Sequence, residues 1–209
     1  MTSRRTTFTG PDGIARCAWC AADPLYVAYH DEEWGRPVRD EVRIYEKLCL
    51  EGFQSGLSWL TILRKREAFR VAFRDFDPET VARFGARDVA RLLQDRGIVR
   101  NRLKIEATIA NARAVLALRE AGVSLTELVW SHAPTRRRPA PRRRADLPAE
   151  TAESRALARE LASRGFRFVG PTTVYAAMQS LGLVDDHFAT CGFRGAATAR
   201  PRRAQRSKR

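Results

Sequence analysis

The chain has 209 residues and a formal net charge of +14, with 44% hydrophobic and 30% charged residues. This balance excludes wholesale disorder, and the length suits one domain or two small fused lobes. No apolar run approaches the ~20 residues that span a bilayer, and the basic start of the chain lacks the apolar stretch of a secretory signal. Four cysteines in a chain of this length do not form a disulfide scaffold. We therefore expect a cytoplasmic protein without membrane contact.

The excess positive charge lies in short segments and not in the body of the chain. Residues 136–144 carry six arginines and no acid, and residues 194–209 carry seven basic residues and no acid. Residues 1–13 add a net charge of one, and everything else balances 23 basic against 23 acidic residues. Charge of this kind points to a polyanion, with nucleic acid first and an anionic membrane second.

This distribution predicts how the chain is organised. We expect a disordered N-terminal arm over 1–13, one domain over 14–193 with an exposed Pro/Arg-rich loop at 133–150, and a disordered basic tail over 194–209. The loop and the tail are either solvated segments without a role or arms that add phosphate affinity without sequence preference.

Helical periodicity dominates the chain, which predicts an all-α fold. Asp40 and Ser58 can cap helices that follow them, and Asp77-Pro78-Glu79 combines a cap, a proline in the first turn and an acid. Further helices are expected around 89–93 with a stop at Gly97, over 103–118, and over 124–131, 149–164 and 172–182. Strand-like alternation is confined to 166–169, and we expect irregular backbone over 16–34.

Residues 92–107 predict two helices around a tight turn at Gly97, and such a turn can direct helix N–H groups at a phosphate. Arg100, Arg102 and Lys104 surround it with positive charge, so these residues with Gly97 are the candidate contacts to a DNA backbone. The turn resembles the helix-hairpin-helix element of base-excision glycosylases. An ordinary helical hairpin is the alternative, because Val99 stands where that element commonly has a second glycine.

Cysteine and histidine residues near the two ends of the chain predict a metal site. His187 and Cys191 are four residues apart, which puts both on one face of a helical turn, and Cys17 and His30 would complete a tetrahedral set. Two thiols and two imidazoles suit Zn²⁺, and four protein ligands indicate a structural site. The spacing leaves two alternatives: Cys20 as a ligand beside Cys17, or buried thiols with solvated histidines.

Aromatic side chains and one carboxylate predict a pocket for a planar ligand. Trp19, Tyr26, Tyr29 and Trp34 crowd a segment with few aliphatic residues. Glu51 ends an apolar helix face and is followed by two glycines and Trp59. The alternative is a surface glutamate beside tryptophans of the core.

The chain resembles the type I DNA-3-methyladenine glycosylases. The resemblance rests on motifs in family order over about residues 16–191: Cys-Ala-Trp at 17–19, Asp-Pro-Leu-Tyr at 23–26, Tyr-His-Asp-Glu-Glu-Trp-Gly at 29–35, Leu-Glu-Gly-Phe-Gln-Ser-Gly-Leu-Ser-Trp at 50–59, Gly-Ile-Val-Arg-Asn-Arg-Leu-Lys-Ile at 97–105, Ala-Asn-Ala-Arg at 110–113, Phe-Val-Gly-Pro-Thr-Thr at 168–173 and Gly-Leu-Val-Asp-Asp-His at 182–187. Asp185 stands where many members have Asn, and the block at 136–144 has no counterpart in the family pattern.

The resemblance implies a helix-hairpin-helix glycosylase in which a structural Zn²⁺ links the two ends of the domain. It implies the zinc ligands Cys17, His30, His187 and Cys191, which decides against Cys20. It implies a base pocket formed by Trp19, Tyr26, Tyr29, Trp34, Trp59 and the catalytic Glu51. The expected partner is double-stranded alkylated DNA bound by a monomer, and the alternative is a DNA-damage-binding protein without turnover.

The resemblance also implies an undemanding reaction, because 3-methyladenine is cationic and leaves more readily than adenine. Residues 105–131 contain no Asp that could serve as the post-hairpin catalytic acid of related glycosylases. We expect no lyase step, since Lys47, Lys65 and Lys104 are interpreted as surface residues or phosphate contacts.

Overall fold

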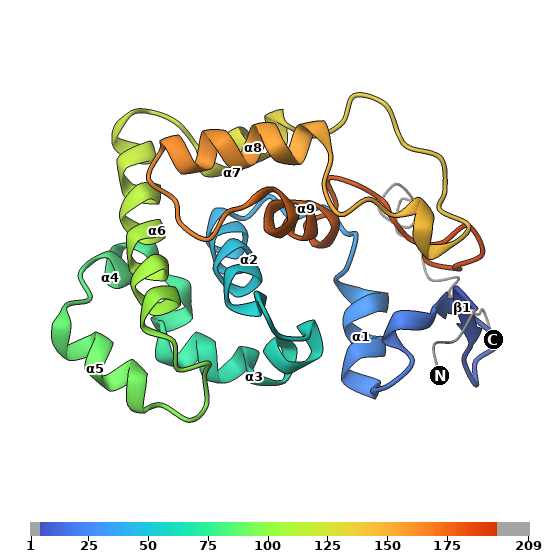
Figure 1. The fold of residues 1–209 in the computed structure, drawn as a ribbon, viewed down its shortest axis with the longest axis horizontal. Helices are drawn as coiled ribbons and strands as arrows, with labels where there is room; N and C mark the ends of the chain where they lie inside the picture. Colours follow the sequence, from blue (N-terminus) through green and yellow to red (C-terminus); the bar gives the residue numbers. More distant parts are fainter. Residues whose placement is uncertain (1–4, 196–209) are drawn as a thin grey trace, which may run out of the picture.

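The computed structural model describes residues 5–195, so most of the expected basic tail, residues 196–209, lies outside the described residues, as do residues 1–4. Figure 1 shows helices gathered around α2, with the two strands at one end of the molecule. None of the helices within residues 5–195 is long and apolar enough to cross a membrane. The elements are the strands β1 (Thr7–Thr9) and β2 (Ala15–Cys17), the helices α1 (Pro24–Glu32), α2 (Glu41–Gln54), α3 (Trp59–Ala72), α4 (Pro78–Ala82), α5 (Ala86–Gln94), α6 (Arg102–Glu120), α7 (Leu125–Ser131), α8 (Ala152–Ser163) and α9 (Pro171–Ser180), and the 3-10 helices η1 (Ala18–Cys20), η2 (Arg74–Phe76) and η3 (Arg144–Asp146).

Side-chain caps set the starts of the central helices, and the predicted all-α class is confirmed. The Asp40 carboxylate accepts the Arg43 N–H at 2.9 Å at the start of α2. Ser58 accepts the Thr61 N–H at 3.2 Å at the start of α3. Asp77 does the same for α4, with Pro78 in the first turn. Each cap satisfies an N–H group that has no partner within its helix.

The core is built on α2, which packs against α3, α6, α7 and α9. The buried aromatic side chains of the core form a continuous group, in which the ring centroids of Phe53 on α2 and Phe69 on α3 lie 4.6 Å apart. Tyr45 is also buried, and its hydroxyl donates to the Thr108 carbonyl of α6 at 2.9 Å. This packing holds α2 rigidly, so a side chain on it has a defined position.

The N-terminal arm expected to be disordered over 1–13 is ordered from residue 5, and β1 pairs antiparallel with β2. The hairpin is held from outside as well. The Gly192 N–H donates to the Ala15 carbonyl at 2.8 Å, and the Thr7 and Thr190 hydroxyls lie 3.0 Å apart. The prediction was wrong because these stabilising contacts come from a segment more than 170 residues away in the sequence.

Two local predictions were also wrong. The segment 16–34 is largely helical, since Asp23 caps α1 through the Leu25 N–H at 2.8 Å and Pro24 occupies the first turn. No strand forms at 166–169, where Phe168 takes a φ of 56°. The backbone there is bonded to a side chain of α6 instead, since the Arg167 N–H donates to Asn111 Oδ1 at 2.7 Å and the Arg167 carbonyl accepts from Asn111 Nδ2 at 3.2 Å.

Candidate functional site

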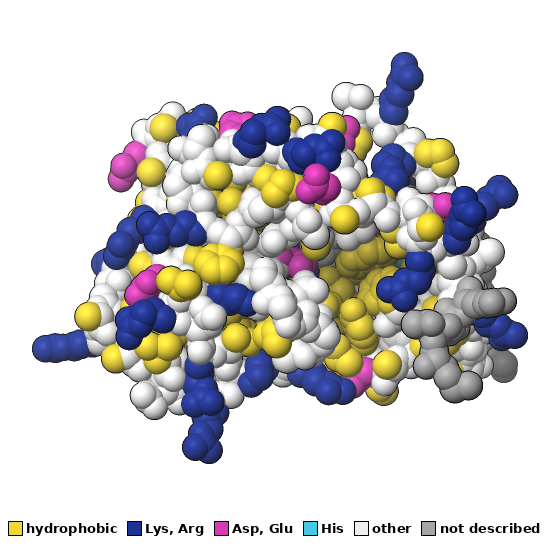
Figure 2. Space-filling view, in the orientation of Figure 1, with side chains coloured by type: hydrophobic (Ala, Val, Ile, Leu, Met, Phe, Trp, Pro, Cys, Tyr) yellow, Lys and Arg dark blue, Asp and Glu magenta, His cyan; other side chains and the backbone are white. Residues whose placement is uncertain are grey.

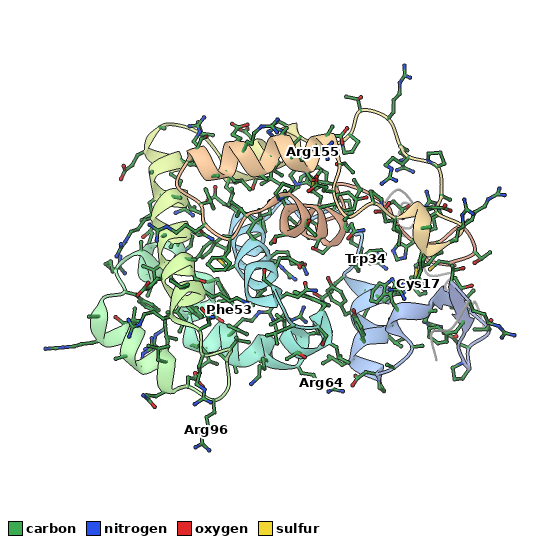
Figure 3. The ribbon with its side chains drawn as sticks, viewed as in Figure 1. Cys17, Trp34, Phe53, Arg64, Arg96 and Arg155 are labelled. Carbon is green, nitrogen blue, oxygen red and sulfur yellow. The ribbon has the colours of Figure 1, made fainter. Side chains whose placement is uncertain are left out.

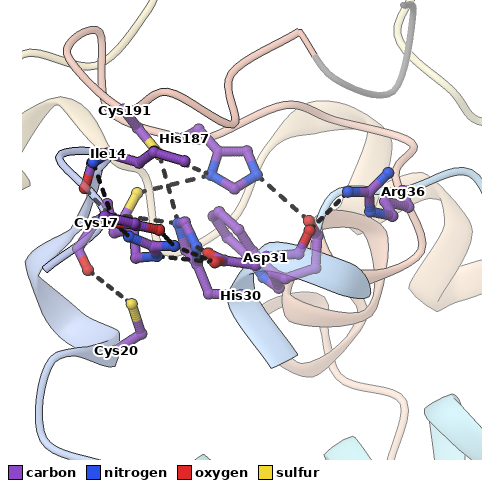
Figure 4. Close-up of polar contacts among 11 residues, drawn as sticks. Ile14, Cys17, Cys20, His30, Asp31, Arg36, His187 and Cys191 are labelled. Carbon is purple, nitrogen blue, oxygen red and sulfur yellow. Dashed lines mark hydrogen bonds and ion pairs between the residues drawn. The ribbon is translucent and has the colours of Figure 1, made fainter. Parts of the chain in front are cut away.

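The four predicted metal ligands lie together where the two ends of the domain meet (Figure 4). Cys17 ends β2, His30 lies in α1, and His187 and Cys191 come from the segment after α9. All four are buried, and their ligand atoms lie within 4.8 Å of one another. The residues from 185 to 191 are not helical, so the expected helical turn is wrong, and a bond from the Cys191 N–H to the Phe188 carbonyl at 2.8 Å closes the turn instead.

The spacing of these atoms fits one tetrahedral ion. Zn–S and Zn–N bonds of usual length imply S···N edges of about 3.6 Å. The Cys191 sulfur lies 3.5 Å from both His30 Nε2 and His187 Nδ1, and the Cys17 sulfur lies 3.7 Å from His187 Nδ1. The donor set therefore could hold a metal ion, and it leaves no open position for a substrate.

Outer contacts orient both imidazoles toward the ion position. His30 Nδ1 lies 2.7 Å from the Asp31 carboxylate, which is also bonded to the Arg16 guanidinium at 2.8 Å. His187 Nε2 lies 3.3 Å from the Trp34 carbonyl. With these nitrogens occupied, His30 Nε2 and His187 Nδ1 are the nitrogens that could bind an ion, an arrangement that is usual for metal-binding histidines.

Cys20 lies outside the cluster, although it is buried three residues after Cys17. Its thiol donates to the Cys17 carbonyl at 3.1 Å, and burial raises the pKa of Cys20 to about 12. Hydrogen bonds lower the pKa of Cys191 to about 2, the largest contribution coming from the Cys17 thiol and smaller ones from the two imidazoles. The cluster therefore favours the thiolate, which is the form of cysteine that binds a metal ion.

Asp185, which departs from the family pattern, stabilises the loop that carries His187. One carboxylate oxygen accepts the His187 N–H at 3.3 Å, and the other accepts the Gly195 N–H at 2.9 Å. An aspartate therefore satisfies backbone groups on both sides of the metal ligands.

A cavity of about 220 Å³ opens beside the metal cluster, and all five predicted aromatic residues line it. Figure 2 shows it as a hollow lined by hydrophobic side chains, and Figure 3 shows that Trp34, one of the lining residues, lies near Cys17. The Trp19 ring lies 5.0 Å from Trp34 and 5.2 Å from His30, so the metal cluster backs one wall. On the other side Tyr29 and Trp59 pack with centroids 5.5 Å apart.

Glu51 is the one carboxylate of the cavity wall among the described residues, and it is 5% exposed. Its Oε1 lies 3.0 Å from Lys47 Nζ, one helical turn earlier on α2. Lys47 also donates to the Tyr29 hydroxyl at 2.9 Å, and its Nζ lies 3.4 Å from the centre of the Trp59 ring. The expectation that Lys47 is a surface residue is wrong, because its side chain is only 11% exposed.

Burial and pairing act in opposite directions on this ion pair. Burial raises the pKa of Glu51 and lowers the pKa of Lys47, and their mutual attraction opposes both shifts. Burial also raises the pKa of Tyr29 well above its ordinary value, so Tyr29 remains a neutral phenol. Since its oxygen accepts the bond from Lys47, its own proton is available to a ligand.

The four residues predicted to contact a DNA backbone lie in or near the hairpin turn between α5 and α6, but they differ in exposure. Arg100 and Arg102 are exposed, whereas Lys104 is buried and donates to the carbonyls of Phe53 and Ser55 at 2.8 and 2.7 Å. The phosphate contact predicted for Lys104 is therefore wrong, because its ammonium group binds the end of α2. Gly97 allows close packing, since a Cβ there would lie 2.9 Å from the Ala68 Cβ.

Other residues near the turn take roles that the sequence did not indicate. Lys65 donates to the carbonyls of Arg96 and Gly97 at 2.9 and 3.2 Å, which fixes the turn to α3. Arg96 itself projects away from the fold (Figure 3). Further cavity residues also escaped the sequence analysis: Gln54, Leu147, Ala176 and Gln179 line the hollow with the aromatic side chains. No spacing signal marks them, because α9 and the loop before α8 meet α2 only in the folded chain.

The fold and site define a class: a helical protein with a metal-binding cluster and an adjoining aromatic cavity that offers a buried carboxylate to a planar, positively polarised ligand. The methyladenine glycosylase family model matches residues 19–195. The chain belongs to that family.

Individual relatives agree with this assignment over most of their length. The chain is 48% identical over 181 residues to DNA-3-methyladenine glycosylase 1 of Escherichia coli K12, covering 85% of this chain and 96% of the relative. It is 45% identical over 179 residues to the Haemophilus influenzae DNA-3-methyladenine glycosylase, covering 84% and 96%.

Solved structures agree as well. A crystal structure of 3-methyladenine DNA glycosylase I matches with a TM-score of 0.83 at 47% identity, covering 86% of this chain and 99% of that one. The Staphylococcus aureus enzyme, whose structure describes 3-methyladenine recognition, matches with a TM-score of 0.81 at 36% identity, covering 86% and 96%.

Proposed function

We propose that this protein is a DNA-3-methyladenine glycosylase that flips the damaged base out of alkylated double-stranded DNA and hydrolyses its N-glycosidic bond. The observation that carries the proposal is the buried Glu51 carboxylate in the wall of an aromatic cavity. Relatives that match over nearly their whole length have the same name, which supports this activity. We infer a monomer that acts in the cytoplasm, and the four free cysteines fit a reducing compartment.

The polar groups of the cavity suit the edge of an adenine ring. Adenine presents an acceptor at N7 beside a donor at its exocyclic amine. In the proposed complex the Tyr29 hydroxyl donates to N7 and Glu51 accepts from the amine. The aromatic faces and the carboxylate favour a cationic ring, and each cation–π contact contributes roughly 0.5–2 kcal/mol.

Lys47 completes this arrangement by stabilising the ionised form of Glu51 in a buried position. An unpaired carboxylate with so little exposure would take up a proton and lose its attraction for a cationic base. Because the leaving base is already positive, the reaction needs no strong general acid. We infer a monofunctional enzyme, so borohydride trapping of the reaction should yield no covalent protein–DNA adduct.

The four-ligand cluster is proposed to hold one Zn²⁺. The ion would supply a tetrahedral crosslink between the two ends of the domain, and it takes no part in bond cleavage. Cys17 and His30 provide the N-terminal half of the ligand set, and His187 and Cys191 provide the C-terminal half.

Base release from methylated DNA tests the proposed activity. The wild-type protein should release 3-methyladenine in preference to 7-methylguanine. Glu51→Gln should lose about 1.5–3 kcal/mol of stabilisation in the transition state, which is a loss of about 10- to 150-fold in kcat/KM. Glu46→Gln is the matched control, because Glu46 lies on the same helix but pairs with Arg70 outside the cavity.

Two outcomes would contradict the proposal. A folded wild-type protein that binds methylated DNA and releases no base would be a damage-binding protein without turnover. Full activity of a folded Glu51→Gln variant would remove Glu51 from the mechanism.

A further inference from the structure

The loop between α7 and α8 is fixed to the body of the protein at several points, although its sequence suggests a solvated arm. Pro141 is buried, and its carbonyl accepts the Ala189 N–H at 2.9 Å. Arg138 donates to the Tyr175 hydroxyl at 2.8 Å, and that hydroxyl donates to Asp186. The loop therefore has a defined position relative to α9 and to the segment that carries the metal ligands.

The same loop forms part of the wall of the base cavity. Leu147 lines the cavity and packs against the small core around Cys17 and Cys191. The Leu147 N–H donates to the Arg144 carbonyl at 3.1 Å, which closes the single turn of η3. The backbone of Arg144 is thus one hydrogen bond away from a residue of the cavity wall.

Three consecutive arginines stand at this point, and we call Arg142, Arg143 and Arg144 the rim arginines. All three are exposed, and the side chain of Arg143 is 80% exposed. Asp146 accepts the N–H groups of Arg142 and Arg143 at 2.9 and 3.1 Å, which fixes the backbone of the turn.

The charges of the rim arginines are mostly uncompensated. Asp146 pairs with the Arg143 guanidinium at 3.0 Å. The guanidinium groups of Arg142 and Arg144 have neither a hydrogen-bond nor an ion-pair partner within residues 5–195. Two unpaired cations are therefore placed by a rigid turn beside the cavity.

From these contacts we infer that the rim arginines bind the phosphates that flank the extruded nucleotide. This inference rests on the proposed glycosylase function. A base can enter the cavity only if its own strand follows it to the mouth, which brings the adjacent phosphates to that edge. Arginine matches phosphate oxygens with a bidentate geometry.

The figures agree with this placement. Figure 2 shows Lys and Arg side chains beside the hydrophobic hollow on its right, the side on which Figure 1 draws η3. In the same view, the turn between α5 and α6 lies on the other side of the gap between α1 and α2. The duplex would be held by the hairpin on one side and by the rim arginines on the other.

The test measures how affinity depends on salt for two duplexes, one undamaged and one with a single tetrahydrofuran analogue of an abasic site. The variant is Arg142→Ala with Arg144→Ala, which removes no contact that positions the turn. The slope of log Kobs against log salt should become less negative by about 1.8 on the analogue duplex, which is 0.9 for each lost phosphate contact. The undamaged duplex should change less, because its backbone does not reach the cavity mouth.

A matched control removes two arginines elsewhere. Arg155→Ala with Arg159→Ala changes the charge by the same amount on α8, where both residues are exposed, and its slope should stay at the wild-type value. An equal change in the control, an equal change on both duplexes, or an unchanged slope in the rim variant would each overturn the inference. Base release by the wild-type protein is measured in parallel. If the wild type releases no base, the proposed function fails; if it releases base while the rim variant keeps its slope, only the rim inference fails.

Discussion

Lys47 and Glu51 depend on each other because both are charged side chains with little exposure to water. Removing one partner of a buried ion pair leaves the other charge uncompensated, which typically costs about 3–5 kcal/mol. Lys47 also contacts Tyr29 and Trp59, so its position connects both aromatic walls to the carboxylate. The pair therefore controls the charge of the site as well as its shape.

Lys47→Met should move the acidic limb of the excision rate profile to higher pH. Without the lysine, burial alone acts on Glu51, so its pKa rises further above the ordinary 4.5. The folded variant then holds a proton that the unfolded chain releases, so the free energy of unfolding should fall as pH rises above about 4.5. Single-turnover rates and denaturant unfolding across the pH range measure both effects.

The double variant Lys47→Met with Glu51→Gln serves as the control, because it removes both charges. It should recover most of the lost stability at neutral pH while remaining defective in excision. A pH profile of Lys47→Met that coincides with the wild-type profile would contradict the role given to the ion pair.

At the scale of elements, two lysines join neighbouring elements by donating to backbone carbonyl groups. Lys104, from the first turn of α6, binds the carbonyls of Phe53 and Ser55 at the end of α2. Lys65, from α3, binds the carbonyls of the hairpin turn. Both lysines donate hydrogen bonds to carbonyl groups that have no hydrogen-bond partner within a helix. The cavity side of α2 and the hairpin are thereby joined through side chains.

Lys104→Met should change only the stability of the protein, and Arg100→Ala should change only its DNA binding. Lys104→Met should lower the free energy of unfolding by about 1–3 kcal/mol, because the carbonyls of Phe53 and Ser55 lose their donor, and the salt dependence of DNA binding should not change. Arg100→Ala should leave stability unchanged and make the salt slope less negative by about 0.9. Chemical denaturation and binding titrations measure these changes. A changed salt slope in folded Lys104→Met would restore Lys104 as a phosphate contact.

At the scale of the whole molecule, the cluster of Cys17, His30, His187 and Cys191 joins segments that have little core of their own. The N-terminal hairpin is two strands of three residues, and the segment after α9 contains no helix up to residue 195. Two-stranded hairpins are marginal in isolation. The N-terminal hairpin and the segment after α9 therefore depend on their contacts with each other and on the four cluster residues that they and α1 contribute. We expect these contacts to determine whether this side of the cavity is closed.

Cys17→Ser or Cys191→Ser should abolish stoichiometric zinc and lower the melting temperature, while Cys20→Ser should keep one zinc per chain. Cys20 is the matched control, because it is equally buried and lies three residues from Cys17 but donates to a carbonyl. Metal analysis of protein purified without chelators and thermal unfolding measure the two effects. Zinc retained by both ligand variants, or lost from Cys20→Ser, would contradict the assigned ligand set.

The sequence was sufficient for features whose causes are local. Asp40, Ser58 and Asp77 start helices because each cap accepts a hydrogen bond from the N–H group three residues later. The four cysteine and histidine residues of the cluster and the five aromatic residues of the cavity were also found in the sequence, because their residue types are rare and their motifs resemble those of a family.

Tertiary contacts decided everything that depends on residues distant in the chain. Lysine side chains usually lie in water, and the sequence does not show that Lys47 and Lys104 are buried. Their burial follows from tertiary contacts, which bring Tyr29 and Trp59 onto Lys47 and the end of α2 onto Lys104. The arginines at 142–144 are a run of charge in the sequence, and only the anchored turn beside Leu147 places them at the cavity. Local bonding sets the helices, whereas burial and the position of each charge depend on which surfaces the fold brings together.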